Sequence, residues 1–167
     1  SLYTTKIGEE MNDMPDRLLK EAVIFDIDGT LANNEHRVHH LYPEDGSKKD
    51  WEAFFEDQSD DSVIPDVRRV LQMYNYSGVR IYILTGRGEE YRGDTVKWLW
   101  NYDIKYERLA MRPLDDRTND DILKINQIKA WQAEGIKIVG LYDDRKRICD
   151  AARAHGITVF QMAAGDF

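Results

Sequence analysis

Short apolar runs alternate along the chain with longer segments whose apolar residues recur at helical spacing. The runs predict five β-strands, at 22–25, 80–84, 108–111, 136–142 and 157–161. The segments between them predict helices at roughly 62–77, 90–102, 119–134 and 145–155. Strands that alternate with helices form parallel sheets with helices on both faces. The pattern therefore predicts an α/β fold built on a parallel five-stranded sheet.

Three of these strands end in polar or glycine-containing sequence. The three segments are Asp26-Ile-Asp-Gly-Thr30, Thr85-Gly-Arg87 and Asp143-Asp-Arg145. In open parallel sheets, ligands bind beyond the carboxyl ends of the strands, where such segments meet. We therefore expect one functional site at this edge of the sheet.

The longest connection without a periodic pattern covers residues 31–61. Connections of this length are frequently functional, so we predict that it forms a flap or lid. Residues 1–20 are polar and lack a clear period, and we interpret them as an N-terminal extension or an expression remnant. Residues 21–167 then form one domain.

Composition limits the class of protein and the kind of partner. The 167 residues are 42% hydrophobic and 32% charged, which is typical of a globular domain. A formal net charge of −8 argues against binding nucleic acid or an anionic membrane through bulk positive charge. Residues 44–61 hold eight acids and two bases, so they carry −6 and the rest of the chain only −2. Any nucleic-acid binding should therefore be local, at the end of a nucleic-acid strand and not along a duplex.

The single cysteine, Cys149, excludes an intramolecular disulfide and favours a reducing compartment. Its helical context favours a small buried residue over a nucleophile. No apolar run is long enough to span a bilayer, and we recognise no signal peptide. We therefore expect a cytoplasmic protein that does not act at a membrane.

Two acidic pairs follow predicted strands. Asp26 and Asp28 repel and desolvate each other at the end of a buried strand unless a cation or a proton compensates. Oxygen ligands without a partnering Cys or His favour Mg²⁺ over zinc. The second pair, Asp143 and Asp144, can close on the same ion. One carboxylate is then free to act as a nucleophile while its neighbour handles a proton.

Donors suited to a phosphoryl group lie in matching places. Phosphoryl transfer needs positive charge and hydrogen-bond donors around the equatorial oxygens. Thr85 offers a hydroxyl, Gly86 permits close approach of the backbone, and Lys124 lies in a predicted helix. Three arginines can make bidentate contacts with a substrate phosphate: Arg37, Arg87 and Arg112.

These segments together resemble the four motifs of the haloacid dehalogenase (HAD) superfamily in order and spacing. The matching residues are Phe25-Asp-Ile-Asp-Gly-Thr-Leu31, Leu84-Thr-Gly-Arg87, Lys124 and Asp143-Asp144. The resemblance implies a HAD-like Rossmannoid three-layer sandwich with a small cap, at residues 31–61, after the first strand.

Residues 20–167 more closely resemble the 3′-phosphatase domains of bacteriophage polynucleotide kinase/phosphatases. The likeness rests on Arg37, which lies 11 residues after Asp26, and on Met111-Arg112, which precedes Asp120-Asp-Ile-Leu-Lys124. It extends to the final Ala163-Ala-Gly-Asp-Phe167. The stretch 38–61 departs from that family, so substrate contacts there do not transfer.

The resemblance implies a Mg²⁺-dependent phosphatase that acts through an aspartyl-phosphate on 3′-phosphorylated DNA or RNA ends in nucleic-acid repair. Asp26 would be the nucleophile, and Asp28 the general acid and then the base. Mg²⁺ would be held by Asp26, the main-chain carbonyl of Asp28 and Asp144, with Asp143 beside the ligands. Thr85 and Lys124 would bind the phosphoryl group. The implied substrate-binding residues are Arg37, Gly86, Arg87 and Arg112, with Asp120 supporting them.

Two other functions stay open: a nucleotidase or other small-molecule HAD phosphatase, and a catalytically silent nucleic-acid-binding domain. A small cap favours a polymer substrate because it leaves the carboxyl ends of the β-strands open. A silent domain is disfavoured because every reactive residue of the motifs is present. The chain holds no P-loop motif G-x-x-x-x-G-K-[ST], so we expect no 5′-kinase activity from it. A separate kinase or ligase partner and a homo-oligomer both stay open.

Five further residues allow more than one interpretation. We interpret the segment with His36, His39 and His40 as a solvated flap. The other interpretations are a contact with a phosphate or a proton, and a zinc site. Trp98 and Trp100 lie two apart on a predicted helix and therefore point to different faces. We expect one in the core and the other partly exposed, with a base-stacking platform as the alternative.

Overall fold

Five parallel strands form the central sheet, in the order β5-β4-β1-β6-β7. The computed structural model describes residues 20–165, so the predicted extension at 1–20 lies outside the described residues but for Lys20. The bounds of the strands are Glu21–Phe25 for β1, Arg80–Gly88 for β4, Arg108–Arg112 for β5, Lys137–Arg145 for β6 and Val159–Gly165 for β7. The predicted five-stranded parallel sheet is confirmed.

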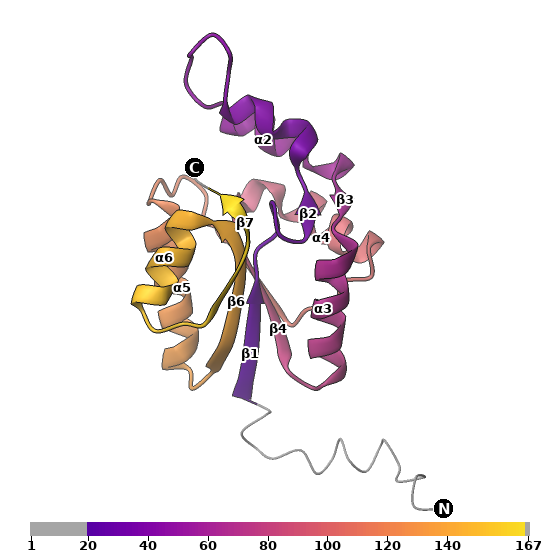
Figure 1. Cartoon of the computed structure of the whole chain (residues 1–167), viewed down its shortest axis with the longest axis vertical. Helices are drawn as coiled ribbons and strands as arrows, with labels where there is room; N and C mark the ends of the chain where they lie inside the picture. The colour runs from indigo at the N-terminus through magenta and orange to yellow at the C-terminus, as the bar shows by residue number, and fades with distance from the viewer. Residues whose placement is uncertain (1–19, 166–167) are drawn as a thin grey trace, which may run out of the picture.

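Helices cover both faces of this sheet (Figure 1). The helices α3 (Pro65–Tyr76) and α4 (Arg92–Asn101) pack on one face, and α5 (Asp120–Ala133) and α6 (Lys146–Ala154) pack on the other. Side chains of β1 alternate between the two resulting cores, since successive residues of a strand point to opposite faces. A strand covered on both faces is apolar throughout, which is why 22–25 is an unbroken apolar run.

Two of the three strands that carry the reactive motifs, β4 and β6, are longer than their apolar runs. The sequence predicts β4 to end at Leu84 and β6 at Tyr142, but the ladders continue to Gly88 and Arg145. The pairing is irregular there, with register shifts between Leu84 and Gly88 and between Asp143 and Arg145. These irregular ends place the motif residues at the carboxyl edge of the sheet.

Residues 32–63 form a folded insertion between β1 and α3. Its ends pair as a two-stranded antiparallel ribbon, β2 (Ala32–Asn33) with β3 (Ser62–Val63). Between them lie two 3₁₀ helices, η2 (Glu35–Leu41) and η3 (Asp57–Asp60), and the helix α2 (Trp51–Glu56). In Figure 1 the insertion rises beyond the carboxyl ends of the strands. That 31–61 acts as a cap stays a prediction.

Three predictions about single residues can be compared with this fold. Trp98 is 3% exposed and Trp100 is 82% exposed, so the split between core and surface is confirmed. Cys149 is buried, as its context predicts, and its thiol contacts the main-chain oxygen of Asp143 at 3.5 Å. Within residues 20–165, no helix has both the length and the apolar character needed to cross a membrane.

Leu71→Ala tests the core between α3 and the sheet. Leu71 is fully buried there, so we expect the free energy of unfolding to fall by about 2–5 kcal/mol, from lost burial and the cavity left behind. Met73→Ala on the same helix is the control, because Met73 is 65% exposed and should change stability by about 0.5 kcal/mol or less. Urea unfolding measures both, and equal losses would contradict this packing.

Candidate active site

Three buried carboxylates meet where β1 and β6 end. The two strands pair in parallel with Phe25 opposite Tyr142, so the residues that follow, Asp26 and Asp143, come side by side. The amide of Asp26 donates to the carbonyl of Tyr142 at 2.9 Å, which extends this pairing. Oxygen atoms of Asp26, Asp143 and Asp144 lie within 4.8 Å of one another. Of the first predicted acidic pair, only Asp26 joins Asp143 and Asp144 in this cluster.

One buried cation from α5 reaches this cluster. Nζ of Lys124 donates to Oδ1 of Asp26 at 3.0 Å and to Oδ2 of Asp143 at 2.8 Å. Burial alone would lower the pKa of Lys124, but the charges of Asp143 and Asp26 raise it. The lysine therefore stays protonated, and the site holds three carboxylates against one ammonium group.

This excess of negative charge affects two of the carboxylates. Burial, followed by repulsion from Asp143, raises the pKa of Asp26 well above its ordinary value. Burial and Asp143 likewise raise the pKa of Asp144, to about 7. A divalent cation between these oxygens would remove the repulsion. This is the only group of three or more side chains among the described residues that could hold a metal ion, and it contains no histidine.

Asp143 and Asp144 lie in tightly packed surroundings. Asp143 accepts from Lys124 through Oδ2 and from the amide of Arg145 through Oδ1 at 2.9 Å, so both of its oxygens have protein partners. Gly29 has a φ of +78°, and a Cβ there would lie 2.1 Å from Oδ2 of Asp144. Only glycine lets this turn pass so close to the carboxylate. Asp143 thus suits a supporting position beside the metal ligands.

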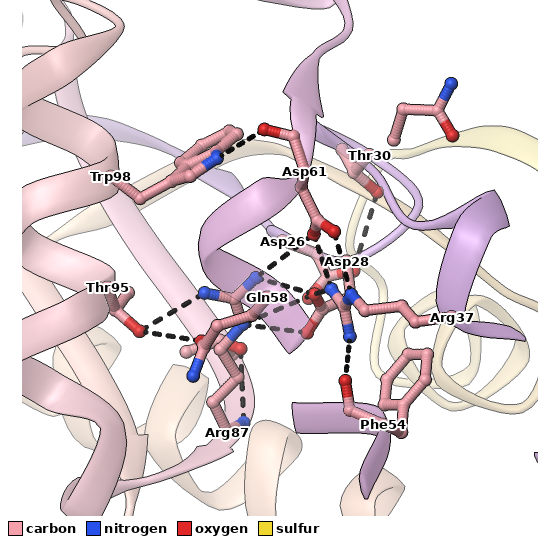
Figure 2. A network of polar contacts seen from close by, with 12 residues as sticks. Asp26, Asp28, Thr30, Arg37, Phe54, Gln58, Asp61, Arg87, Thr95 and Trp98 are labelled. Atoms are coloured by element: carbon pink, nitrogen blue, oxygen red, sulfur yellow. Dashed lines mark hydrogen bonds and ion pairs between the residues drawn. The ribbon is translucent and has the colours of Figure 1, made fainter. Parts of the chain in front are cut away.

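Asp28 is held apart from this cluster by two arginines (Figure 2). Nη2 of Arg87 donates to Oδ1 at 2.7 Å and Nε donates to Oδ2 at 3.0 Å, while Nη2 of Arg37 also donates to Oδ1. Burial alone would raise the pKa of Asp28, but the charges of Arg87 and Arg37 and their hydrogen bonds lower it. In this arrangement the Asp28 carboxylate is ionised.

Arg37 is fully buried by contacts within the insertion. It donates to both carboxylate oxygens of Asp61, from Nε at 2.9 Å and from Nη2 at 2.6 Å, and to the carbonyl of Phe54 at 2.9 Å. Its guanidinium lies 4.1 Å from the centre of the Phe54 ring. The predicted direct contact between Arg37 and substrate does not match this arrangement, because the folded insertion surrounds the guanidinium. Arg37 acts here on Asp28.

Thr85 lies in the turn after the apolar part of β4, and its contact with a phosphoryl group stays a prediction. Its hydroxyl is buried and accepts a hydrogen bond from the amide of Arg87 at 3.1 Å, which stabilises the turn after the apolar part of β4. Nη1 of Arg87 in turn donates to the hydroxyl of Thr95 at 3.2 Å. The residues that line the pocket over the carboxylates include Arg87 but not Thr85.

Asp120 lies between two arginines at the open side of the site. It accepts from Arg112, and Nη1 of Arg145 donates to it at 2.7 Å. Arg112 also donates to the carbonyl oxygens of Asp116 and Thr118, at 3.1 and 2.6 Å. Gly86 faces the same carboxylate. Asp120 thus positions both arginines, and its supporting role toward a substrate stays a prediction.

Two connected cavities lie above these residues. The smaller, about 50 Å³, covers the carboxylate cluster; we call it the catalytic pocket. The larger, about 740 Å³, runs between the insertion and the loop after β5; we call it the groove. Residues that line both are Trp51, Phe55, Gly86, Asp120 and Arg145. The catalytic pocket therefore opens into the groove.

Two functional positions were missed by sequence reasoning. Asp61 is one of eight acids in an acidic segment, and nothing in its local pattern distinguishes it, yet its carboxylate is fully buried on Arg37. Its main-chain oxygen also accepts from the indole of Trp98 at 2.9 Å. The second is Arg145, which the sequence could have indicated because it directly follows Asp143-Asp144 at a strand end.

Two of the three histidines considered from sequence, His36, His39 and His40, lie beside acids. His36 is 2.6 Å from Asp61, and His40 is 3.2 Å from Asp57.

Comparison with known proteins places residues 20–167 in the family described as polynucleotide kinase PNKP phosphatase domain. A relative in Autographa californica nuclear polyhedrosis virus, named as a bifunctional polynucleotide kinase/RNA ligase, is 27% identical over 125 residues. The match covers 74% of this chain and 16% of the relative. The chain therefore corresponds to a small part of that protein.

Solved structures agree with this assignment. A chain of a Pnkp1/Rnl/Hen1 RNA repair complex is 29% identical, with a TM-score of 0.73, over 93% of this chain and 46% of that one. A haloacid dehalogenase-like hydrolase family protein of Streptococcus pneumoniae is 16% identical, with a TM-score of 0.56, over 84% of this chain and 83% of that one. The second likeness shows the fold alone, and it confirms the expected HAD-like architecture.

Asp144→Asn tests the charge excess through the pH dependence of stability. The pKa of Asp144 is about 7 in the folded protein against an ordinary 3.8, so the carboxyl group stabilises the folded state while protonated. That contribution is lost as pH rises through about 7. In EDTA, we expect wild type to become progressively less stable than Asp144→Asn between about pH 4 and pH 7, with no further change above. Urea unfolding measures the difference, and a difference independent of pH would contradict this explanation.

Proposed function

The chain belongs to the polynucleotide kinase PNKP phosphatase-domain family, and from this premise we propose that it hydrolyses the 3′-phosphomonoester of nucleic-acid ends. The observation that carries the proposal is the cluster of Asp26, Lys124, Asp143 and Asp144 in a pocket that opens into a groove. An enclosed site would suit a small metabolite, whereas an open groove leaves room for the rest of a polymer. The names of the relatives, which refer to RNA repair and to a polynucleotide kinase, agree with this substrate class.

Asp26 is the nucleophile in this proposal. One of its carboxylate oxygens attacks the phosphorus, and the bond between phosphorus and the 3′ oxygen breaks, which leaves a phosphoryl group on Asp26. Lys124 donates to Oδ1 of Asp26 and so favours the ionised form that attack requires. Water then attacks the phosphoryl-aspartate, which releases phosphate and restores Asp26.

Asp28 moves the protons in both halves of this reaction. It gives a proton to the departing 3′ oxygen and then takes one from the attacking water. Arg87 and Arg37 hold Asp28 ionised in the present arrangement. Asp28 can therefore donate a proton to the 3′ oxygen only after this contact changes. A phosphate that enters the catalytic pocket can compete with Asp28 for Arg87, which lines the pocket. Losing this partner raises the pKa of Asp28 and prepares it to act as an acid.

Asp26, Asp144 and the main-chain carbonyl of Asp28 would hold Mg²⁺. The donor set fits, because hard oxygen ligands suit this ion and three buried carboxylates face a single lysine. The ion would neutralise the charge that builds up when a phosphate approaches carboxylates. Asp143 would hold Lys124 and support the ligands.

The chain spans less than half the length of the repair-complex chain it resembles, and 16% of the viral relative. Kinase or ligase activity would therefore reside in other segments or in a partner chain. This partner class follows from the relatives' names, which include a kinase, a ligase and the other members of a repair complex.

A panel of substrates tests the reaction and its specificity. We expect phosphate release from a 3′-phosphorylated oligonucleotide with Mg²⁺, little release from its 5′-phosphorylated counterpart, and none with EDTA. Phosphate release from free nucleotides is measured in parallel. Hydrolysis of free nucleotides with no hydrolysis of either oligonucleotide would instead identify a nucleotidase.

Asp26→Asn tests the nucleophile. An amide cannot form the phosphoryl intermediate, so we expect turnover to fall to below about one-thousandth of wild type, with the fold retained by circular dichroism. The matched control is Asp66→Asn, an exposed position on α3, which should keep full activity. Substantial turnover by Asp26→Asn would remove Asp26 as the nucleophile.

A further inference from the structure

The groove beside the catalytic pocket has one aromatic wall. Trp51 and Phe55 come from α2, and Tyr91 comes from η4 (Glu89–Tyr91), which follows β4. The rings of Trp51 and Phe55 lie 5.9 Å apart at 26°, and those of Phe55 and Tyr91 lie 5.6 Å apart. All three side chains are partly exposed. Two parts of the chain thus combine into one continuous ring surface that faces open space.

The opposite side of the groove carries arginines. Arg112 and Arg145 are joined to Asp120 at the mouth of the catalytic pocket, and Arg117 and Arg147 also line the groove. The guanidinium of Arg145 also lies 5.9 Å from the ring of Trp51, so the two sides meet near the catalytic pocket. A ligand that enters would therefore have apolar rings on one side and guanidinium groups on the other.

The groove nevertheless has no excess of positive charge. Its four arginines are matched by five acids among the lining residues, which are Glu52, Glu90, Asp115, Asp116 and Asp120. Long-range attraction for a phosphate backbone is therefore weak, and local contacts must supply the affinity. Stacking of a base on an aromatic ring is such a contact, and it works with any base because every base has a flat face.

The position and size of the groove define how much of a nucleic acid it can hold. It shares Trp51, Phe55 and Arg145 with the catalytic pocket, so whatever carries a phosphate on Asp26 continues directly along the aromatic wall. Its volume of about 740 Å³ lies in the range of sites for small organic ligands. One or two nucleotides fit inside the groove, and the rest of a longer strand would continue outside it.

We propose that the groove is a binding site for the 3′-terminal nucleoside of a single-stranded end, with its base stacked on Trp51 and Tyr91. This proposal rests on the proposed function and identifies its substrate as an unpaired end, because a groove of this volume has no room for a second, complementary strand. The backbone lies on the arginine side, which also carries Asp115, Asp116 and Asp120. Trp98 and Trp100, the platform considered from sequence, do not line the groove.

Two oligonucleotides separate stacking from all other contacts. One is a 3′-phosphorylated single strand, and the other is identical except that its terminal nucleotide is abasic. We expect Trp51→Ala to lower the ratio of kcat/KM between the two about tenfold, within the range typical of one stacked base. Trp51→Phe should restore most of the ratio. The control is Trp100→Ala, an exposed tryptophan on α4, which should leave the ratio unchanged.

Tyr91→Ala keeps the test valid if Trp51→Ala unfolds the insertion, since Tyr91 lies outside the insertion. It should lower the same ratio in the same direction. If neither variant changes the ratio by more than about twofold while wild type hydrolyses both strands, the groove is not a stacking site and the proposed function stands.

Binding distinguishes the remaining outcomes. A single strand with 2-aminopurine as its 3′-terminal base should lose fluorescence on binding to Asp26→Asn, and adding Trp51→Ala should abolish that loss. If the loss occurs and depends on Trp51 but wild type releases no phosphate from any strand, the stacking site stands and the proposed hydrolysis is wrong. If neither quenching nor hydrolysis is seen, both are wrong.

Discussion

The repulsion among three buried carboxylates at the ends of β1 and β6 is the constraint on which the rest of the site depends. Backbone pairing forces Asp26 and Asp143 together, because Phe25 and Tyr142 face each other one residue earlier. Lys124 compensates only part of the charge, and a cation or a proton must compensate the remainder. The raised pKa values of Asp26 and Asp144 express this need.

A second group of charges connects the insertion to the chemistry. Asp28 accepts hydrogen bonds from Arg87 of β4 and from Arg37 of the insertion. Arg37 in turn donates to Asp61. Asp61 in turn is tied to α4 through the indole of Trp98 (Figure 2). The position of Asp28 therefore depends on how the insertion is folded. In this way the insertion contributes to the site even where it does not face the catalytic pocket.

Much of this architecture could be predicted from the chain, and the exceptions share a cause. The five strands and four long helices follow from apolar periodicity, since both faces of the sheet are buried. The sequence predicts β4 and β6 too short because the pairing resumes at Gly88 in β4 and continues through Asp143 and Arg145 in β6, where no apolar side chains mark the strand. The helices of the insertion were missed because each is too short to show a period. The sequence assigns Arg37 to substrate, but one of its two carboxylate partners, Asp61, lies 24 residues away, and that contact is visible only in space.

The sequence by itself determined the sheet, the motifs at its carboxyl edge and the residues that meet there, because local patterning and the parallel topology bring Asp26, Lys124 and Asp144 to one place. Only the tertiary structure decided what each group faces. It placed Arg37 on Asp61 and Asp28, Thr85 on the backbone, and three aromatic rings along the groove. Side-chain partners depend on how distant segments pack, and that information is not carried by any local spacing.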